Sequence, residues 1–261
     1  LVSARQGNLR LETKAQVKNL VVEDGRVVGV NWWHGMEKSD ASLPQPPMDT
    51  VRQARATKEV VLAAGAVGSP HLLMTSGIGD PEELARHGIT RIASLPGVGK
   101  NLHDHLQIRA VFRLENERAP TLNKMAGPPF RRKKKGPQYM LTRTGPLSAA
   151  PSQLGAFVKS GPEEEAPNLQ FHVQPLSLDY FGADLHPFSG ITASVCNLQP
   201  TSRGSLRLAG ADPRISPLID PAYLSTQRDR DVAAASIRIA REIVMGSSSF
   251  ARHEPAEYFP G

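Results

Sequence analysis

Residues 60–79 read VVLAAGAVGSPHLLMTSGIG and decide the fold expected of this chain. The apolar run 60–64 is short enough for a buried parallel strand. The small residues 64–66 then remove side-chain bulk where the strand ends, so that a ligand can lie against bare backbone. Ser69 is a favourable N-cap and Pro70 suits the first helical position, which predicts a helix start there. This pattern is one way to hold an anionic cofactor, and it equally fits an ordinary strand-to-helix turn.

Length and composition place the chain among ordinary globular proteins. Its 261 residues suffice for one large domain or two modest ones, and 39% of them are hydrophobic and 21% charged. No apolar run approaches the roughly 20 residues of a membrane helix. The single cysteine, Cys196, excludes an internal disulfide and fits a reducing compartment, so we expect a cytoplasmic protein. Because it lies in an apolar-rich stretch, we expect it to be a buried small hydrophobe.

The net charge of +6 raises the question of nucleic acid, since basic proteins often bind it. Much of the excess lies in the run 131–135, which reads RRKKK and is flanked by proline and glycine. Such a run is usually a solvated loop. The sequence has no zinc-finger spacing and no aromatic-rich RNA-binding motif, so we expect no nucleic-acid partner.

The N-terminal part alternates strands and helices. Residues 9–33 predict a β-hairpin with its turn at 23–26, and the polar segment 34–58 predicts a surface loop. Asp80 is predicted to be the N-cap residue of a helix with a capping-box pattern, in which proline occupies N1 and glutamate N3. The stretch 96–99, PGVG, lacks the third glycine of a dinucleotide fingerprint and predicts a turn without a phosphate-binding role.

Beyond His105 the alternation stops, and short strand-like pieces are separated by proline and glycine. These pieces predict an antiparallel sheet that forms one wall of a substrate site; they are 107–114, 153–158, 168–173, 190–198 and 204–208. A helix over 226–244, capped by Ser225 or Thr226, carries an apolar face at helical spacing. The expected fold class is therefore α/β plus α+β.

Several motifs resemble those of the glucose–methanol–choline (GMC) flavin oxidoreductases, nearest the choline-dehydrogenase-like branch. They fall in order along most of the chain: GSPHLLMTSGIG at 68–79, LPGVGKNLHDH at 95–105, PTSRG at 200–204 and IDPAYL at 219–224. The resemblance implies a partial FAD-binding domain with a central parallel sheet over 1–105. It also implies a partial substrate-binding domain on an antiparallel sheet over 106–261.

The resemblance further implies an alcohol oxidation in which FAD accepts a hydride while a base takes the hydroxyl proton. Two parts of the family pattern do not occur in this sequence. The Gly-x-Gly-x-x-Gly turn that anchors FAD is absent, and the family's catalytic histidine pair corresponds to positions beyond Gly261. We therefore expect an interior fragment, inactive and at most a weak FAD binder by itself, with no catalytic residue of its own and an unknown electron acceptor.

The cofactor-binding residues implied by the resemblance come from the hairpin, the strand end and the domain boundary. They are Val17, Ala64, Gly65, Ala66, Ser69, Asp104 and His105. A plain core valine fits position 17 equally well. The pair formed by His103 and His105 has no third ligand at a typical spacing, so we expect no metal site.

Two residues are expected in the substrate pocket. Gln153 stands where choline-handling relatives carry a glutamate that meets the trimethylammonium group, which predicts an uncharged alcohol in preference to choline. His186 corresponds to a region that approaches the active site in some relatives, and a loop histidine without a special role is the alternative. A second function class stays open, namely a catalytically silent domain whose basic loop binds an anionic partner.

Overall fold

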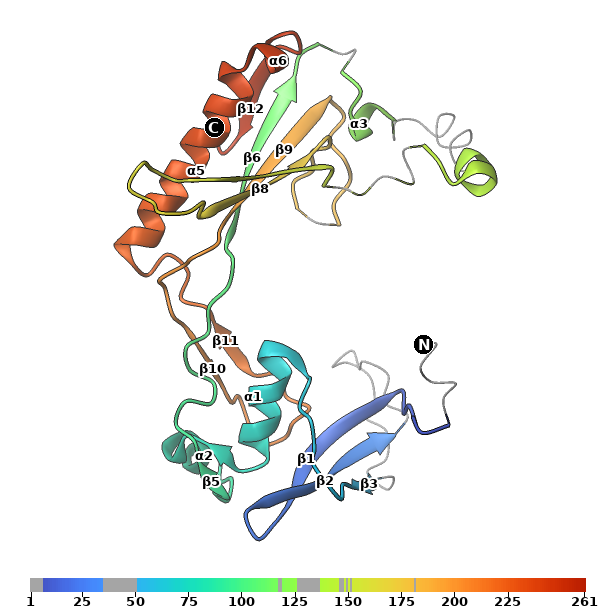
Figure 1. The fold of residues 1–261 in the computed structure, drawn as a ribbon, viewed down its shortest axis with the longest axis vertical. Coiled ribbons are helices and arrows are strands. Elements are labelled where there is room, and N and C mark those ends of the chain that lie inside the picture. Colours follow the sequence, from blue (N-terminus) through green and yellow to red (C-terminus); the bar gives the residue numbers. More distant parts are fainter. Residues whose placement is uncertain are drawn as a thin grey trace. The chain divides into compact units, whose positions relative to one another are not determined.

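The computed structural model describes residues 7–34, 51–116, 119–125, 137–145, 148, 150, 152–180 and 182–261 (Figure 1). The chain divides into two compact units. Unit 1 comprises Leu1–His103 and Arg203–Ala222, and unit 2 comprises Asp104–Ser202 and Tyr223–Gly261. The first stretch of unit 1 ends at His103, two residues before the predicted boundary at 105. The second stretch, residues 203–222, was predicted to belong to the second domain.

A three-stranded antiparallel sheet in unit 1 contains the predicted hairpin. Its strands are β1 (Ala15–Glu23), β2 (Arg26–His34) and β3 (Val51–Arg55), in that order. Asp24 and Gly25 form the turn with φ values of 49° and 75°, as a two-residue turn with both central residues left-handed requires. The expectation of a loop throughout 34–58 is wrong, because β3 pairs with β2. The residues 35–50 of that loop lie outside the described part of the chain.

Helix α1 (Gly65–Thr75) begins earlier than the sequence predicts. Ser69 and Pro70 lie inside the helix, and Ala64 occupies the N-cap position, so the predicted cap at Ser69 is wrong. The preceding residues 60–64 form no strand in the described structure, and Val61 is 77% exposed. A strand requires a hydrogen-bonded neighbour, and no described segment pairs with this run. The central parallel sheet expected around it is therefore not confirmed.

Short elements complete unit 1 around a small apolar cluster. Helix α2 (Pro81–Arg86) begins with Asp80, whose side chain accepts from the N–H of Glu82, which confirms the predicted N-cap. The remaining strands form a parallel pair, β4 (Ile78–Gly79) with β5 (Ala93–Ser94), and an antiparallel pair, β10 (Ser205–Arg207) with β11 (Leu218–Asp220). The cluster consists of Met74, Leu84, Leu206 and Leu208.

Unit 2 is built on a five-stranded antiparallel sheet in the order β12-β6-β9-β8-β7. Four of its strands are predicted ones: β6 (Gln107–Leu114), β7 (Leu154–Val158), β8 (Leu169–Gln174) and β9 (Gly190–Asn197). The edge strand β12 (Pro255–Phe259) was not predicted. The fifth predicted strand, near 204–208, belongs to the separate pair β10–β11 in unit 1.

One face of this sheet packs against helix α5 (Gln227–Gly246), as Figure 1 shows. Thr226 caps α5 by accepting from the N–H of Asp229, which confirms one of the two predicted caps. The core between helix and sheet includes Phe112, Phe171 and Val232, at most 5% exposed. The short helices α3 (Leu122–Met125) and α6 (Ser248–Ala251) precede β7 and β12 in the chain.

The buried thiol of Cys196 fits its predicted role as a small hydrophobe, since it is 6% exposed. Burial, and secondarily the Asp104 carboxylate, raise the pKa of this thiol, so it stays protonated and unreactive at neutral pH. Among the described helices, none is long and apolar enough to span a bilayer.

Candidate functional site

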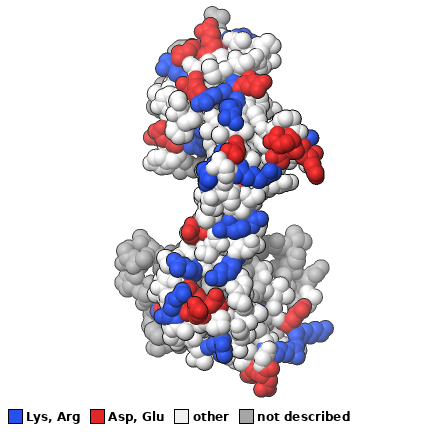
Figure 2. Space-filling model, turned by 90° about the vertical axis from the view of Figure 1, so that its left-hand side faces the viewer, with Lys and Arg blue, Asp and Glu red and all other residues white. Residues whose placement is uncertain are grey.

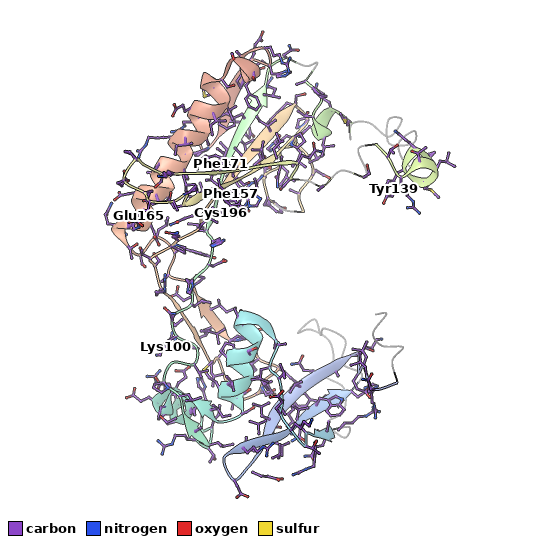
Figure 3. The ribbon with its side chains drawn as sticks, in the orientation of Figure 1. Lys100, Tyr139, Phe157, Glu165, Phe171 and Cys196 are labelled. Carbon is purple, nitrogen blue, oxygen red and sulfur yellow. The ribbon has the colours of Figure 1, made fainter. Side chains whose placement is uncertain are left out.

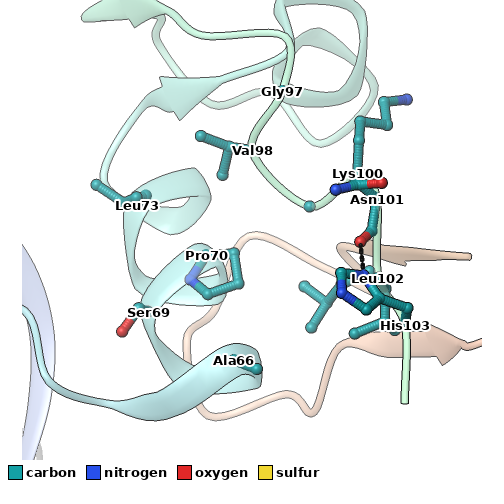
Figure 4. A pocket seen from close by; sticks show the side chains of 12 residues that line it. Ala66, Ser69, Pro70, Leu73, Gly97, Val98, Lys100, Asn101, Leu102 and His103 are labelled. Carbon is teal, nitrogen blue, oxygen red and sulfur yellow. Dashed lines mark hydrogen bonds between the residues drawn. The ribbon is translucent and has the colours of Figure 1, made fainter. Parts of the chain in front are cut away.

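A pocket of about 480 Å³ in unit 1 lies between α1 and the segment Gly97–His103 (Figure 4). Helix α1 contributes small and apolar residues, and the facing segment contributes two glycines together with larger apolar and polar residues. Its lining consists of Ala66, Ser69, Pro70, Leu73, Gly97, Val98, Gly99, Lys100, Asn101, Leu102, His103 and Leu206. Two predicted cofactor-binding residues, Ala66 and Ser69, thus share one cavity.

The helical wall of the pocket begins at a corner without side-chain bulk. Ala64 and Ala66 flank Gly65, which has a left-handed φ of 78°. A Cβ atom at Gly65 would meet no atom within 4 Å, so open space surrounds the backbone there. The hydroxyl of Ser69 accepts from the N–H of Ala64 at 3.1 Å, which fixes the corner against the first turn of α1.

The opposite wall is a turn held in an unusual backbone conformation. Gly99 has a φ of 80°, and Asn101 has a φ of 60°, a left-handed value that asparagine tolerates better than most residues. The ring nitrogen Nδ1 of His103 hydrogen-bonds the carbonyl of Asn101 at 2.8 Å, drawn as the dashed line in Figure 4. Leu102 and Gly204 exchange two backbone hydrogen bonds of 3.1 and 2.7 Å. The turn predicted at 96–99 is thus confirmed.

The cation on this wall is Lys100, whose ammonium lies 3.7 Å from the Asp80 carboxylate. The pKa of Asp80 is lowered, chiefly by the backbone N–H of Glu82 and more weakly by Lys100. Lys100 is 56% exposed, so its charge remains accessible to an anionic group. Figure 3 labels Lys100 on this segment.

The other predicted cofactor residues lie outside the pocket lining. Val17 is half-buried on β1 opposite Trp32, next to a register shift between Val17 and Asn19. Asp104 and His105 follow the pocket wall directly in sequence but belong to unit 2. There the Asp104 carboxylate accepts from the N–H of His105 at 2.8 Å and from the hydroxyl of Tyr223 at 2.5 Å.

The two predicted substrate-pocket residues are associated with opposite edges of the unit 2 sheet. Gln153 is exposed beside edge strand β7 and donates its N–H to Val173 at 3.1 Å. The His186 side chain is 9% exposed and stacks on Phe188 with 4.8 Å between ring centroids. Its Nε2 lies 3.0 Å from Asp179, and Tyr258 of the other edge strand, β12, packs edge-on against the ring. The structure therefore does not bring Gln153 and His186 together.

Sequence reasoning missed the contribution of residues 97–103 to the pocket. The available signal was the pair of glycines in PGVG followed by an asparagine, residue types that tolerate left-handed backbone.

The described residues hold no group of three or more side chains suited to a metal ion. Acidic and basic side chains are mixed on the face drawn in Figure 2, and the basic run 131–135 lies outside the described residues.

Comparison with known proteins agrees with this architecture. The N-terminal profile of GMC oxidoreductase matches residues 1–107, and the C-terminal profile matches residues 200–260. An alcohol dehydrogenase [acceptor] of Pseudomonas putida is 38% identical over 97% of this chain and 44% of its own length. An oxygen-dependent choline dehydrogenase of Chromohalobacter salexigens is 33% identical over 98% of this chain and 43% of its own length.

The fold also matches solved structures. A formate oxidase of Aspergillus oryzae RIB40 superposes with a TM-score of 0.85 at 21% identity, covering 100% of this chain and 48% of that one. The chain thus spans about half the length of the relatives that it matches. With two profiles of one family matched in order and relatives above 30% identity along nearly all its residues, the chain belongs to the GMC oxidoreductase family.

Proposed function

We propose that the complete gene product is an FAD-dependent oxidoreductase that acts on the CH–OH group of an alcohol. The observation that carries this proposal is the pocket beside the bare corner 64–66, in a chain of the GMC family. When bound, the flavin supplies a two-electron acceptor for the carbinol hydride. The electron acceptor that regenerates the flavin is left open.

The residues of the pocket fit a large anionic cofactor. Gly65 leaves open space at a left-handed backbone position, and Ala64 and Ala66 add only methyl groups beside it. The first turn of α1 offers backbone N–H groups, which suit an anion. Ser69 and the exposed Lys100 add a hydroxyl and a cation to this environment. We assign cofactor contacts to the corner and to Ser69.

Val17, Asp104 and His105 complete the proposed cofactor set. Val17 would meet the cofactor through its backbone, since its half-buried side chain lies on a sheet that packs against α1. The chain of unit 2 begins with Asp104 and His105, immediately after the pocket wall. Asp104 and His105 would hold that wall in place beside the cofactor.

Unit 2 would supply the substrate wall from the face of its sheet opposite α5, which is exposed at β7 and buried by other segments at Val111, Thr192 and Ser194. The four strands β6 to β9 place on that face Gln107, Arg109, Val111, Arg113, Gly155, Phe157, Gln170, His172, Gln174, Gly190, Thr192, Ser194 and Cys196. Figure 3 labels Phe157 and Cys196 in this region. These strand positions include no carboxylate. The carboxylate of Asp104, whose charge raises the pKa of Cys196, already accepts two hydrogen bonds.

The absence of acids on these strand positions favours an uncharged alcohol over choline. A quaternary ammonium has no N–H to donate, so it needs a carboxylate or an aromatic face in a desolvated pocket. Gln153 beside β7 and Gln170 on β8 provide amides instead, and Phe157, 62% exposed, is the one phenylalanine, tyrosine or tryptophan among these strand positions. His186, held by Asp179, lies at the other edge of the sheet, too far from Gln153 for one small alcohol to contact both, so we leave it out of the proposed substrate contacts.

The test uses the complete gene product, with and without the substitution Gln153→Glu. We expect purified protein to contain FAD, and kcat/KM to be higher for neutral primary alcohols than for choline. Gln153→Glu should raise kcat/KM for choline alone, whereas Gln199→Glu, the same change at an exposed position outside the sheet, should not. A flavin-free protein without alcohol oxidation would refute the activity. Choline as the best substrate of the unmodified protein would refute only the substrate class.

A further inference from the structure

The Asp104 carboxylate has a hydrogen bond on each oxygen. Oδ1 accepts from the backbone N–H of His105 at 2.8 Å, and Oδ2 accepts from the hydroxyl of Tyr223 at 2.5 Å. The second distance is that of a charge-assisted bond, which is stronger than one between neutral groups. This bond, together with burial and the charge of Asp104, raises the pKa of Tyr223. The phenol therefore stays protonated, and remains a donor, throughout the neutral range.

Tyr223 is held in place independently of Asp104. Its neighbours Ala222 and Leu224 both have left-handed φ values, 50° and 56°, which cost residues with a side chain about 1 kcal/mol each. Such conformations persist only where the surroundings impose them. The Asp220 side chain accepts from the N–H of Ala222 at 2.9 Å, and Arg230 donates to the carbonyl of Leu224 at 2.7 Å. The phenol is thus presented from a backbone fixed on both sides.

The acceptor, Asp104, continues the wall of the pocket. The lining ends with Leu102 and His103, and Asp104 is the next residue in the chain. Leu102 is fixed by its two backbone hydrogen bonds with Gly204. The segment that leaves the pocket is therefore held at Leu102 by a backbone pair and at Asp104 by a side chain 119 residues away in sequence.

We propose that Tyr223 is a positioning residue for the cofactor pocket, acting through the Asp104 carboxylate on the segment 101–105. This inference rests on the proposed function, because the pocket is taken as the FAD site. Without the hydroxyl, Asp104 keeps only the bond from His105 and can rotate, so that the wall loses its second point of attachment. The residue touches neither cofactor nor substrate in this role.

The test is Tyr223→Phe in the complete gene product, with Tyr180→Phe as control. Tyr180 is 69% exposed, and the described structure gives its hydroxyl no hydrogen bond. We expect the FAD Kd of Tyr223→Phe to rise about fivefold, or about 1 kcal/mol, as for loss of one partly exposed charge-assisted bond. The kcat at saturating FAD should stay within about twofold, and the melting temperature of the flavin-free protein should match that of the control.

A double-mutant cycle with Asp104→Asn tests whether Tyr223 acts through Asp104. The FAD Kd of the double variant should equal that of Asp104→Asn alone, and additive losses would overturn the proposal. An unchanged FAD Kd in Tyr223→Phe, or a loss matched by a fall in flavin-free stability, would also overturn it. Hydrogen exchange separates this outcome from failure of the proposed function. The His105 amide should exchange faster in flavin-free Tyr223→Phe even if no FAD binds, and unchanged exchange refutes the positioning role.

Discussion

Replacing Asp229 by asparagine should destabilise unit 2, because this buried carboxylate joins the start of α5 to the segment that precedes β10. The residue is 3% exposed. Oδ1 accepts from the N–H of Thr201 at 2.8 Å and from its hydroxyl at 3.0 Å, and Oδ2 accepts from the N–H of Ser202 at 2.8 Å. An asparagine keeps one acceptor and turns an NH2 group toward the N–H of either Thr201 or Ser202.

The pKa of Asp229 gives the magnitude. Burial alone would raise this pKa, but the hydrogen bonds from Ser202 and Thr201 outweigh burial and lower it from 3.8 to about 2. At about 1.4 kcal/mol per pKa unit, the ionised carboxylate contributes about 2.5 kcal/mol at neutral pH. The folded pKa lies below the unfolded one, so this contribution is complete well above pH 3.8 and disappears as the pH falls toward 2. About half of it should be lost by pH 3.

The assay is urea unfolding at pH 7 and pH 3, followed by far-UV circular dichroism and by tryptophan fluorescence. Both tryptophans, Trp32 and Trp33, lie in unit 1, whereas the long helix α5 lies in unit 2. We expect Asp229→Asn to cost about 2.5 kcal/mol at pH 7 in the dichroism transition, about half as much at pH 3, and less in fluorescence. Asp231→Asn, an exposed neighbour on the same helix, is the control. A cost that does not change with pH would refute the reasoning.

Three further predictions concern backbone packing and the thiol. Gly204→Ala should destabilise by several kcal/mol and lower the melting temperature, since a Cβ there would overlap the carbonyl oxygen of Asp220. Gly65→Ala and Gly88→Ala should each cost about 1 kcal/mol for their left-handed φ, but only Gly65→Ala should also lower FAD content in the complete gene product. Cys196 should resist thiol reagents in the folded chain at pH 7 and react after denaturation, and rapid labelling of the native protein would contradict its burial.

The features that sequence reasoning predicted correctly depend on neighbouring residues. Asp24 and Gly25 adopt the two left-handed conformations that this turn needs, whatever lies elsewhere in the chain. Asp80 and Thr226 cap their helices through a side chain that reaches two or three residues ahead. The apolar spacing of α5 predicted the helix, but its buried face only in part: Val232 and Val244 are buried, whereas Ile243 is 40% exposed.

The incorrect predictions involve long-range partners. The local signals at Ser69 and Pro70 favoured a helix start there, yet α1 begins at Gly65 and packs against β1 and β10. Glu83 has the position of a capping-box residue, but it accepts from the N–H of Leu208 at 2.8 Å, a partner 125 residues away. No local pattern encodes such a partner, so tertiary contacts decided both cases.

The candidate site combines both kinds of information. The small residues of the corner 64–66 are visible in the sequence itself, and their part in holding a cofactor stays a prediction. The glycines and the asparagine of the opposite wall indicate left-handed backbone, but its pairing with Gly204 through Leu102 cannot be read from neighbouring residues. Tyr223 stood in a family motif without a role until the fold placed its hydroxyl on Asp104. A polar residue far from the pocket in sequence can therefore position the pocket wall through a hydrogen bond. Such a residue is identified from the hydrogen bond in the structure and not from the pattern of neighbouring residues.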